Sequence, residues 1–234
     1  MIKKRKGSAN VEIVLASVIF ISFIVFMLIY LKPFKSSPVE TSALKVAEAK
    51  IFENISTDLN EVSLKLPVGS VQILPPCSAV SLNIPKPTRI TDQNGNYVET
   101  KRIPGKLYFK SSSGTFFTIY YSDEFEEIPL QDTSLCAEVG DYKLGVIKPY
   151  KKVSSSRLEQ LFQNYDLNYG SLKSYFGLES DFNIIVNERN GTQISPEFQK
   201  SKASGVEVFA KEIPIEILEK NGEIVPATMI LQVW

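Results

Sequence analysis

A single carboxylate, Glu12, stands at the start of the longest apolar run in this chain. From Ile13 to Leu31, nineteen residues follow without a charge, and only Ser17 and Ser22 among them are polar. A carboxylate within an apolar helix is costly unless a cation or hydrogen-bond donors meet it. Glu12 therefore indicates either a specific charge pairing or a side chain that extends from the helix end toward polar surroundings.

Catalytic and metal-binding chemistry has few candidates elsewhere. The 234 residues include no histidine, which removes the commonest general base and the commonest metal ligand. The sequence contains no serine-hydrolase elbow, P-loop, zinc-protease or dinucleotide-binding pattern. We therefore expect no catalytic residue, no metal site and no cofactor, and we predict that the protein is not an enzyme.

The two cysteines, Cys77 and Cys136, are too few and too far apart in sequence for a structural zinc site. A disulfide between them is favoured if the domain lies in an oxidising compartment. Two separate buried thiols are the alternative.

Two polar patterns and two N-x-[ST] sequences are further candidate sites. Asp92, Asn94 and Asn96 resemble the start of a calcium loop, but the later ligand positions do not fit, so a hairpin turn is favoured. The acidic run at 123–127 predicts a solvated face, with weak cation binding as the alternative. Asn54 and Asn190 each begin an N-x-[ST] sequence, a candidate N-glycosylation acceptor that also arises by chance.

The elements that position these residues begin with the apolar run itself. Its length of about 30 Å at 1.5 Å per residue matches a bilayer core, and four basic residues at 3–6 favour a cytoplasmic N-terminus. We expect a transmembrane helix over 8–34. After it, Ser37 and Glu40 form a capping box for an amphipathic helix over 38–62.

Past that helix the pattern changes to short β-prone runs. Turn signals predict hairpins at Asn94-Gly95, within 106–121 and at Asn221-Gly222. Short helices are expected over 155–165 and 171–176. The predicted fold class is α+β: a long N-terminal hydrophobic and amphipathic helix, then a mostly antiparallel β head domain over 63–234 with short inserted helices.

One layout in the first thirty-one residues resembles a known family. A basic leader over 1–7 ends in Gly7, Ser8 follows, and Glu12 is the fifth residue after that glycine, within an apolar helix. This order is similar to the prepilin signal of type IV pilins, which in its archaeal form is called a class III signal peptide. The resemblance covers about an eighth of the chain.

The resemblance implies a processing and assembly route. A prepilin peptidase would cut between Gly7 and Ser8, an assembly ATPase and platform would extract the subunit from membrane lipid, and the helices would bundle with those of other pilin subunits. Glu12 would pair with the new amine of a neighbouring Ser8. Archaeal surface proteins of this kind often carry N-glycans, which Asn54 and Asn190 would accept.

Together these patterns predict a structural subunit of a type IV pilus-like surface filament, either a major or a minor, adhesive pilin. The expected localisation is a single-span membrane protein with an extracellular head, later part of a cell-surface filament. A monomeric membrane-anchored binding protein and a pseudopilin of a secretion or uptake machine are the alternatives. The formal net charge of zero argues against a nucleic-acid partner.

Overall fold

The structure is a computed structural model in which the chain divides into two compact units, Met1–Ser42 and Ala43–Trp234. The first unit contains helix α1 (Ser8–Tyr30), and helix α2 (Pro38–Ile55) runs from the first unit into the second. The structure describes residues 8–30, 38–67, 77–110, 114–127, 133, 136–189, 191–194, 196, 200–202 and 204–234.

A ten-stranded sheet forms most of the second unit. Its order is β12-β11-β14-β13-β10-β1-β7-β3-β4, and β9 also pairs with β1. The strands are β1 (Ser56–Lys65), β3 (Thr88–Asp92), β4 (Tyr97–Val98), β7 (Phe116–Tyr121), β9 (Lys143–Leu144), β10 (Lys148–Ser154), β11 (Phe182–Glu188), β12 (Gln193–Ile194), β13 (Phe209–Leu218) and β14 (Ile224–Val233). All pairs are antiparallel except β10 with β13.

A second, four-stranded sheet has the order β5-β6-β2-β8. It consists of β2 (Cys77–Val80), β5 (Thr100–Ile103), β6 (Lys106–Lys110) and β8 (Ala137–Val139). The hairpin predicted within 106–121 is wrong, because β6 pairs with β5 and β2 whereas β7 pairs with β1 and β3 in the other sheet. Phe109 and Phe117 instead face each other across the core between the sheets, with ring centroids 4.9 Å apart.

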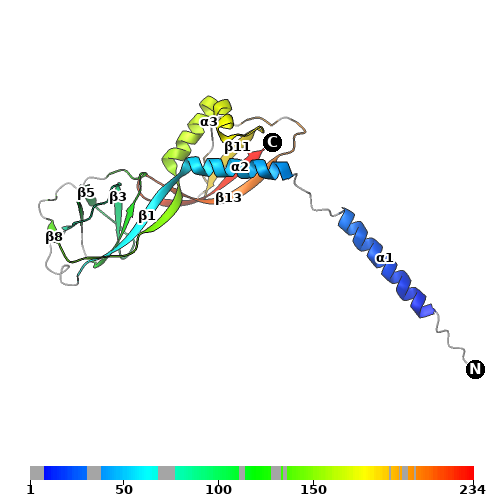
Figure 1. Cartoon of the computed structure of the whole chain (residues 1–234), viewed down its shortest axis with the longest axis horizontal. Helices are drawn as coiled ribbons and strands as arrows, with labels where there is room; N and C mark the ends of the chain where they lie inside the picture. Colours follow the sequence, from blue (N-terminus) through cyan, green and yellow to red (C-terminus); the bar gives the residue numbers. More distant parts are fainter. Residues whose placement is uncertain are drawn as a thin grey trace, which may run out of the picture. The chain divides into compact units, whose positions relative to one another are not determined.

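Helices α2 and α3 (Ser155–Phe176) cover one face of the β10-β13-β14-β11 end of the large sheet (Figure 1). The apolar stripe of α2 packs with that of α3 and with alternate residues of the strands beneath, as the period of two along a strand requires. This core contains Ala47, Ile51, Ile55, Leu158, Leu161, Phe162, Phe176, Phe182, Ile184, Ile217, Met229 and Leu231, among others.

The tyrosines of α3 tie the helix to the start of β11. Tyr165 Oη donates to Phe182 O at 2.7 Å, and Tyr169 Oη accepts from Phe182 N at 2.9 Å. Burial raises the pKa of Tyr165 to about 12 and raises that of Tyr169 as well. Tyr169 also donates to Asp181, whose pKa is lowered chiefly by the hydrogen bond from Lys173.

Two predictions about the helices are wrong, one on the end of α2 and one on the number of helices over 155–176. The helix predicted over 38–62 ends at Ile55, and Ser56 begins β1 without an intervening loop. The two short helices predicted over 155–165 and 171–176 are one helix, α3, with a local departure from helical geometry at Asn168 (φ −141°, ψ 43°).

The predicted fold class, with its long N-terminal helix carrying a head domain, is also wrong. The described part of the chain is mostly β with three helices, and the side chains of α1 are described only over 17 residues, 11–27. The N-terminal region contributes two helices with different surroundings. The described side chains of α1 are exposed, whereas α2 contributes Leu44, Ala47, Ile51 and Ile55 to the core of the β unit.

Candidate functional site

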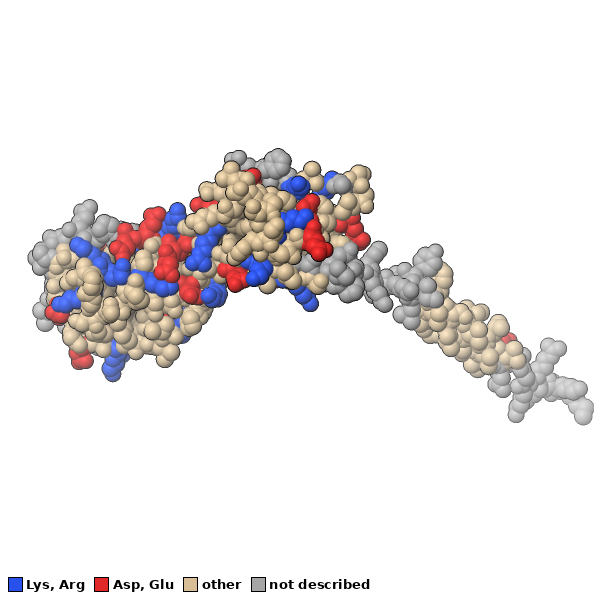
Figure 2. All heavy atoms as spheres, turned by 45° about the horizontal axis from the view of Figure 1, so that its top comes forward, with Lys and Arg blue, Asp and Glu red and all other residues tan. Residues whose placement is uncertain are grey.

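Helix α1 presents an apolar surface on all sides. Its large apolar side chains between Val11 and Met27 are 40–65% exposed, and Figure 2 shows almost no charged atoms along it. Glu12 is the only charged residue of the helix, and its side chain is exposed. A helix that is apolar all round needs equally apolar surroundings. α1 is therefore the first candidate interaction surface.

In the described part of the chain, no helix is both long enough and apolar enough to span a membrane. This finding contradicts the predicted single membrane span and the localisation built on it. Of the two residues at the predicted processing site, Gly7 lies outside the described residues and Ser8 is the first residue of α1.

A disulfide joins Cys77 and Cys136, as predicted, with their Cα atoms 4.5 Å apart. Cys77 begins β2, and Cys136 immediately precedes β8, which runs parallel to β2 with Ser78 opposite Ala137. The bridge therefore closes the end of a short parallel pair whose strands are far apart in sequence.

The other candidate sites have ordinary structural surroundings. Asp92 accepts hydrogen bonds from the backbone N–H groups of Asn94 and Asn96, both at 2.9 Å, so the calcium-like sequence is a hairpin turn between β3 and β4. Among the described residues, no group of three or more acidic or cysteine side chains could hold a metal ion. Asn54 is half-buried in the last turn of α2, and Asn190 lies outside the described residues.

The acidic run at 123–127 is not uniformly solvated, which corrects the prediction. Glu124 is only 8% exposed and accepts hydrogen bonds from Ser156 N at 2.9 Å and Ser156 Oγ at 2.6 Å. It also accepts one from Ser154 Oγ, while Ser154 caps Arg157 N at 3.0 Å. Because the first N–H groups of a helix lack internal partners, this carboxylate and Ser154 together cap α3.

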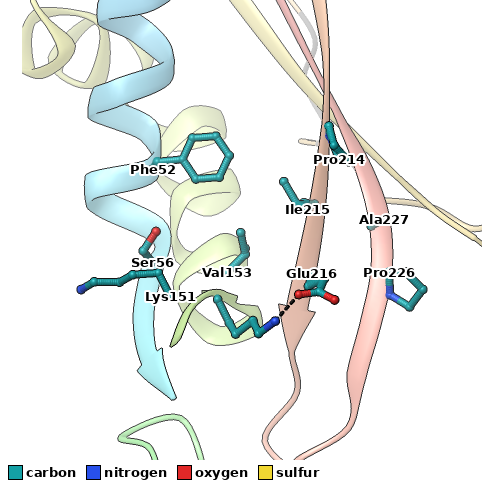
Figure 3. Close-up of a pocket in the computed structure, with 10 residues that line it drawn as sticks. Phe52, Ser56, Lys151, Val153, Pro214, Ile215, Glu216, Pro226 and Ala227 are labelled. Carbon is teal, nitrogen blue, oxygen red and sulfur yellow. Dashed lines mark hydrogen bonds and ion pairs between the residues drawn. The ribbon is translucent and has the colours of Figure 1, made fainter. Parts of the chain in front are cut away.

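A groove opens where the large sheet splits. Strands β10 and β13 are paired only at Val153 with Ile217 and Ser154 with Leu218, so the rest of each strand diverges from the other. The groove between them has a volume of about 590 Å³. Figure 3 shows that Phe52 of α2, Val153 and Ile215 approach it from the helix-covered side, with Lys151, Pro214, Pro226 and Ala227 also on its walls.

One ion pair spans this groove. Lys152 of β10 contacts Glu216 of β13, and each directly precedes the first residue of its strand that pairs with the other, Val153 or Ile217 (Figure 3). The side chains thus meet at the point where backbone pairing stops. The groove has an apolar wall of Phe52, Val153 and Ile215 and a charged rim of Lys152 and Glu216, which makes it a second candidate interaction surface.

The sequence patterns gave no indication of this groove or of the role of Glu124. Both depend on strands and loops that meet only in the folded chain: β10 and β13 are separated by more than fifty residues, and Glu124 contacts a helix that begins at Ser155. The exposure of Leu144, Val146 and Ile147, which marks an interaction surface, likewise appears only in the structure.

No family model, curated protein or solved structure matches this chain.

Proposed function

We propose that the protein is a subunit of a type IV pilus-like filament in which α1 helices of many copies pack together. The observation that carries this proposal is the exposed, uniformly apolar surface of α1 with one carboxylate at its start. Such a surface is stabilised by burial against equally apolar helices, at about 25 cal/mol per Å² of apolar area removed from water. Identical helices of other copies provide that surface.

Glu12 supplies the register of this packing. In a bundle of apolar helices, an isolated carboxylate is destabilising, but a carboxylate paired with a cation in one alignment only disfavours every other alignment. The prepilin-like layout supplies the cation, because cleavage between Gly7 and Ser8 creates an amine four residues before Glu12 on the neighbouring copy. The partners of this proposal are a prepilin peptidase, other subunits, and an assembly ATPase with its platform.

The proposal is tested in two steps on the full-length protein made in cells that contain a prepilin peptidase. Mass spectrometry of the mature chain should give an N-terminus at Ser8. Electron microscopy should then show filaments for the wild type, none for Glu12→Gln or Ile19→Asp, and normal filaments for the control Glu159→Gln. Glu159 is a suitable control because it is an exposed carboxylate on α3, which belongs to the other compact unit.

Each step can fail separately. An intact N-terminus would remove the processing route, and filaments formed normally by Ile19→Asp would remove α1 from the interface. Normal filaments from Glu12→Gln, with none from Ile19→Asp, would keep the helix bundle and reject the register role of the carboxylate.

A further inference from the structure

Among the described residues, no strand pairs with the outer edge of residues 143–152, which is called the free edge below. Strand β9 and strand β10 both pair with β1 on the same side, with Leu144 opposite Leu64 and Lys148 opposite Glu61. Three residues on this segment oppose two on β1, so 145–147 form a bulge, and Gly145 N donates to Ser63 O at 2.8 Å. Since β13 pairs with β10 only from Val153 onward, about 33 Å of this edge is paired with no other strand of the described part of the chain.

The free edge exposes apolar side chains at and beside the bulge. Val146 is 83% and Ile147 54% exposed, and Leu144 and Tyr150 are exposed beside them. Folded proteins normally cover or shorten such edges, because unpaired backbone groups with exposed apolar side chains attract further strands. The segment 143–152 therefore combines unpaired backbone groups with exposed apolar side chains, the two features that attract an extended chain.

The facing edge of β13 offers a second row of backbone groups. Glu219 N donates to Glu223 O across the β13–β14 pair. Because hydrogen-bonded residues alternate along an antiparallel strand, the backbone N–H and C=O groups of Ile217, Ile215 and Ile213 also point toward β14. The N–H and C=O groups of Glu216 and Glu212 then point into the groove. Pro214, at the same edge, has no N–H and leaves only its carbonyl.

The charges of the β9–β10 edge determine the kind of strand that fits. Residues 143–152 contain four lysines and no acid: Lys143, Lys148, Lys151 and Lys152. Val153 belongs to the core under the helices, so alternation places Lys151 on the helix side and Lys148 and Lys152 on the opposite face. Lys151 and Lys148 contact Asp58 and Glu61 of β1 yet remain 73% and 61% exposed.

A second copy of the same edge does not fit, because like charges opposite each other on paired strands are destabilising. A strand that alternates apolar and acidic residues does fit. Its apolar side chains would enter the groove beside Phe52, Val153 and Ile215, and its carboxylates would lie on the other face beside Lys148 and Lys152.

We propose that the free edge of residues 143–152, with the groove between β10 and β13, binds an extended acidic–apolar segment of a partner protein by strand addition. The ion pair between Lys152 and Glu216 closes the groove in the absence of the partner. An incoming carboxylate replaces Glu216 as the contact of Lys152. This inference is separate from the filament proposal, since it uses no residue of α1.

The test measures fluorescence anisotropy of labelled seven-residue peptides with the full-length protein in a mild detergent. A peptide of alternating valine and glutamate should bind saturably, and affinity should fall when salt is raised. A valine–lysine peptide should bind at least tenfold more weakly. The valine–glutamate peptide with alternate backbone nitrogens methylated should also lose at least tenfold, because it cannot complete a strand ladder.

Variants of the edge locate the site. Val146→Asp with Ile147→Asp should weaken binding at least tenfold, and Lys152→Gln about threefold, whereas Glu216→Gln should strengthen binding about threefold by freeing Lys152. The control Leu167→Asp, at an exposed position on α3, should bind like the wild type. Thermal melts establish that each variant is folded.

Several outcomes would overturn the proposal. These are the absence of saturable binding, equal binding of the methylated or lysine peptide, and unchanged binding by the Val146 and Ile147 variant. Weaker binding by Glu216→Gln would show that the pair does not compete with the ligand. Sedimentation in which Ile147→Asp alone converts a dimer to a monomer would assign the edge to a second copy.

Discussion

Replacement of Glu124 by alanine should destabilise the β unit although Glu124 lies in a loop. Glu124 is 8% exposed, and its carboxylate accepts hydrogen bonds in the first turn of α3 from Ser156 N at 2.9 Å and from Ser156 Oγ at 2.6 Å. Alanine removes these acceptors and the hydrogen bond from Ser154 Oγ. The Ser154 cap of Arg157 N stays in place, so the helix keeps part of its capping.

The magnitude follows from the bonds that are lost. Hydrogen bonds to a charged group contribute roughly 1.5–3 kcal/mol each, and a carboxylate at a helix N-terminus adds about 0.3–1 kcal/mol. Water reaches the half-buried Ser156 after the substitution and recovers part of this, which leaves an expected loss of about 2–3 kcal/mol. For a domain of this size, that loss lowers the melting temperature by roughly 4–12 °C.

The assay is urea unfolding of the wild type, Glu124→Ala, Ser156→Ala and the double variant. The two residues should show a coupling energy of about 1 kcal/mol or more, since each loses the same contact. Glu126→Ala is the control, because its side chain is exposed in the same loop. A loss below about 0.5 kcal/mol for Glu124→Ala, or strictly additive effects, would refute the capping role.

Three further predictions use the same unfolding measurement. Replacing Cys77 and Cys136 by serine should cost about 4 kcal/mol, because their bridge closes a 59-residue separation; an unchanged midpoint would contradict this. Gly222→Ala should cost more than Gly105→Ala: both glycines have positive φ, but a Cβ at Gly222 would lie 3.0 Å from Arg89 Cγ, and at Gly105 it meets nothing within 4 Å. Asp181→Asn should be less stable than the wild type at pH 7, because the hydrogen bond from Lys173 lowers the pKa of Asp181 in the folded state. This stabilisation is fully present above the pKa of about 3.9 that Asp has in the unfolded chain. The difference in unfolding free energy between the two proteins should therefore narrow as the pH falls below that value.

Local turn chemistry was readable from the sequence. The Asn94-Gly95 and Asn221-Gly222 pairs form the predicted hairpin turns, with Gly95 and Gly222 at positive φ. The disulfide between Cys77 and Cys136 was also predicted. In each case a few neighbouring residues, or the only possible cysteine pair, decide the outcome.

The end of α2 could not be read in the same way. Ile51, Ile55 and Leu59 recur every four residues, a spacing that fits a helix, yet Leu59 lies in β1. Because four is also a multiple of the strand period of two, the same spacing fits a strand, and pairing of β1 with both β10 and β7 decides between them. Long-range pairing likewise separates β6 from β7, where the sequence suggested one hairpin.

An assembled filament would require that the free edge does not pair with copies of itself, and the lysines of the edge meet this requirement. Packing of α1 helices would hold many β units at high local concentration, where even weak edge-to-edge pairing would be strengthened. An edge with four lysines, a bulge and Pro149 disfavours pairing with copies of itself while remaining open to an acidic strand. The exposed Val146 and Ile147 would otherwise be an aggregation site in an assembled filament. In an assembled filament, the basic charge of the edge would therefore do more than attract a partner: it would keep neighbouring subunits from occupying the site first.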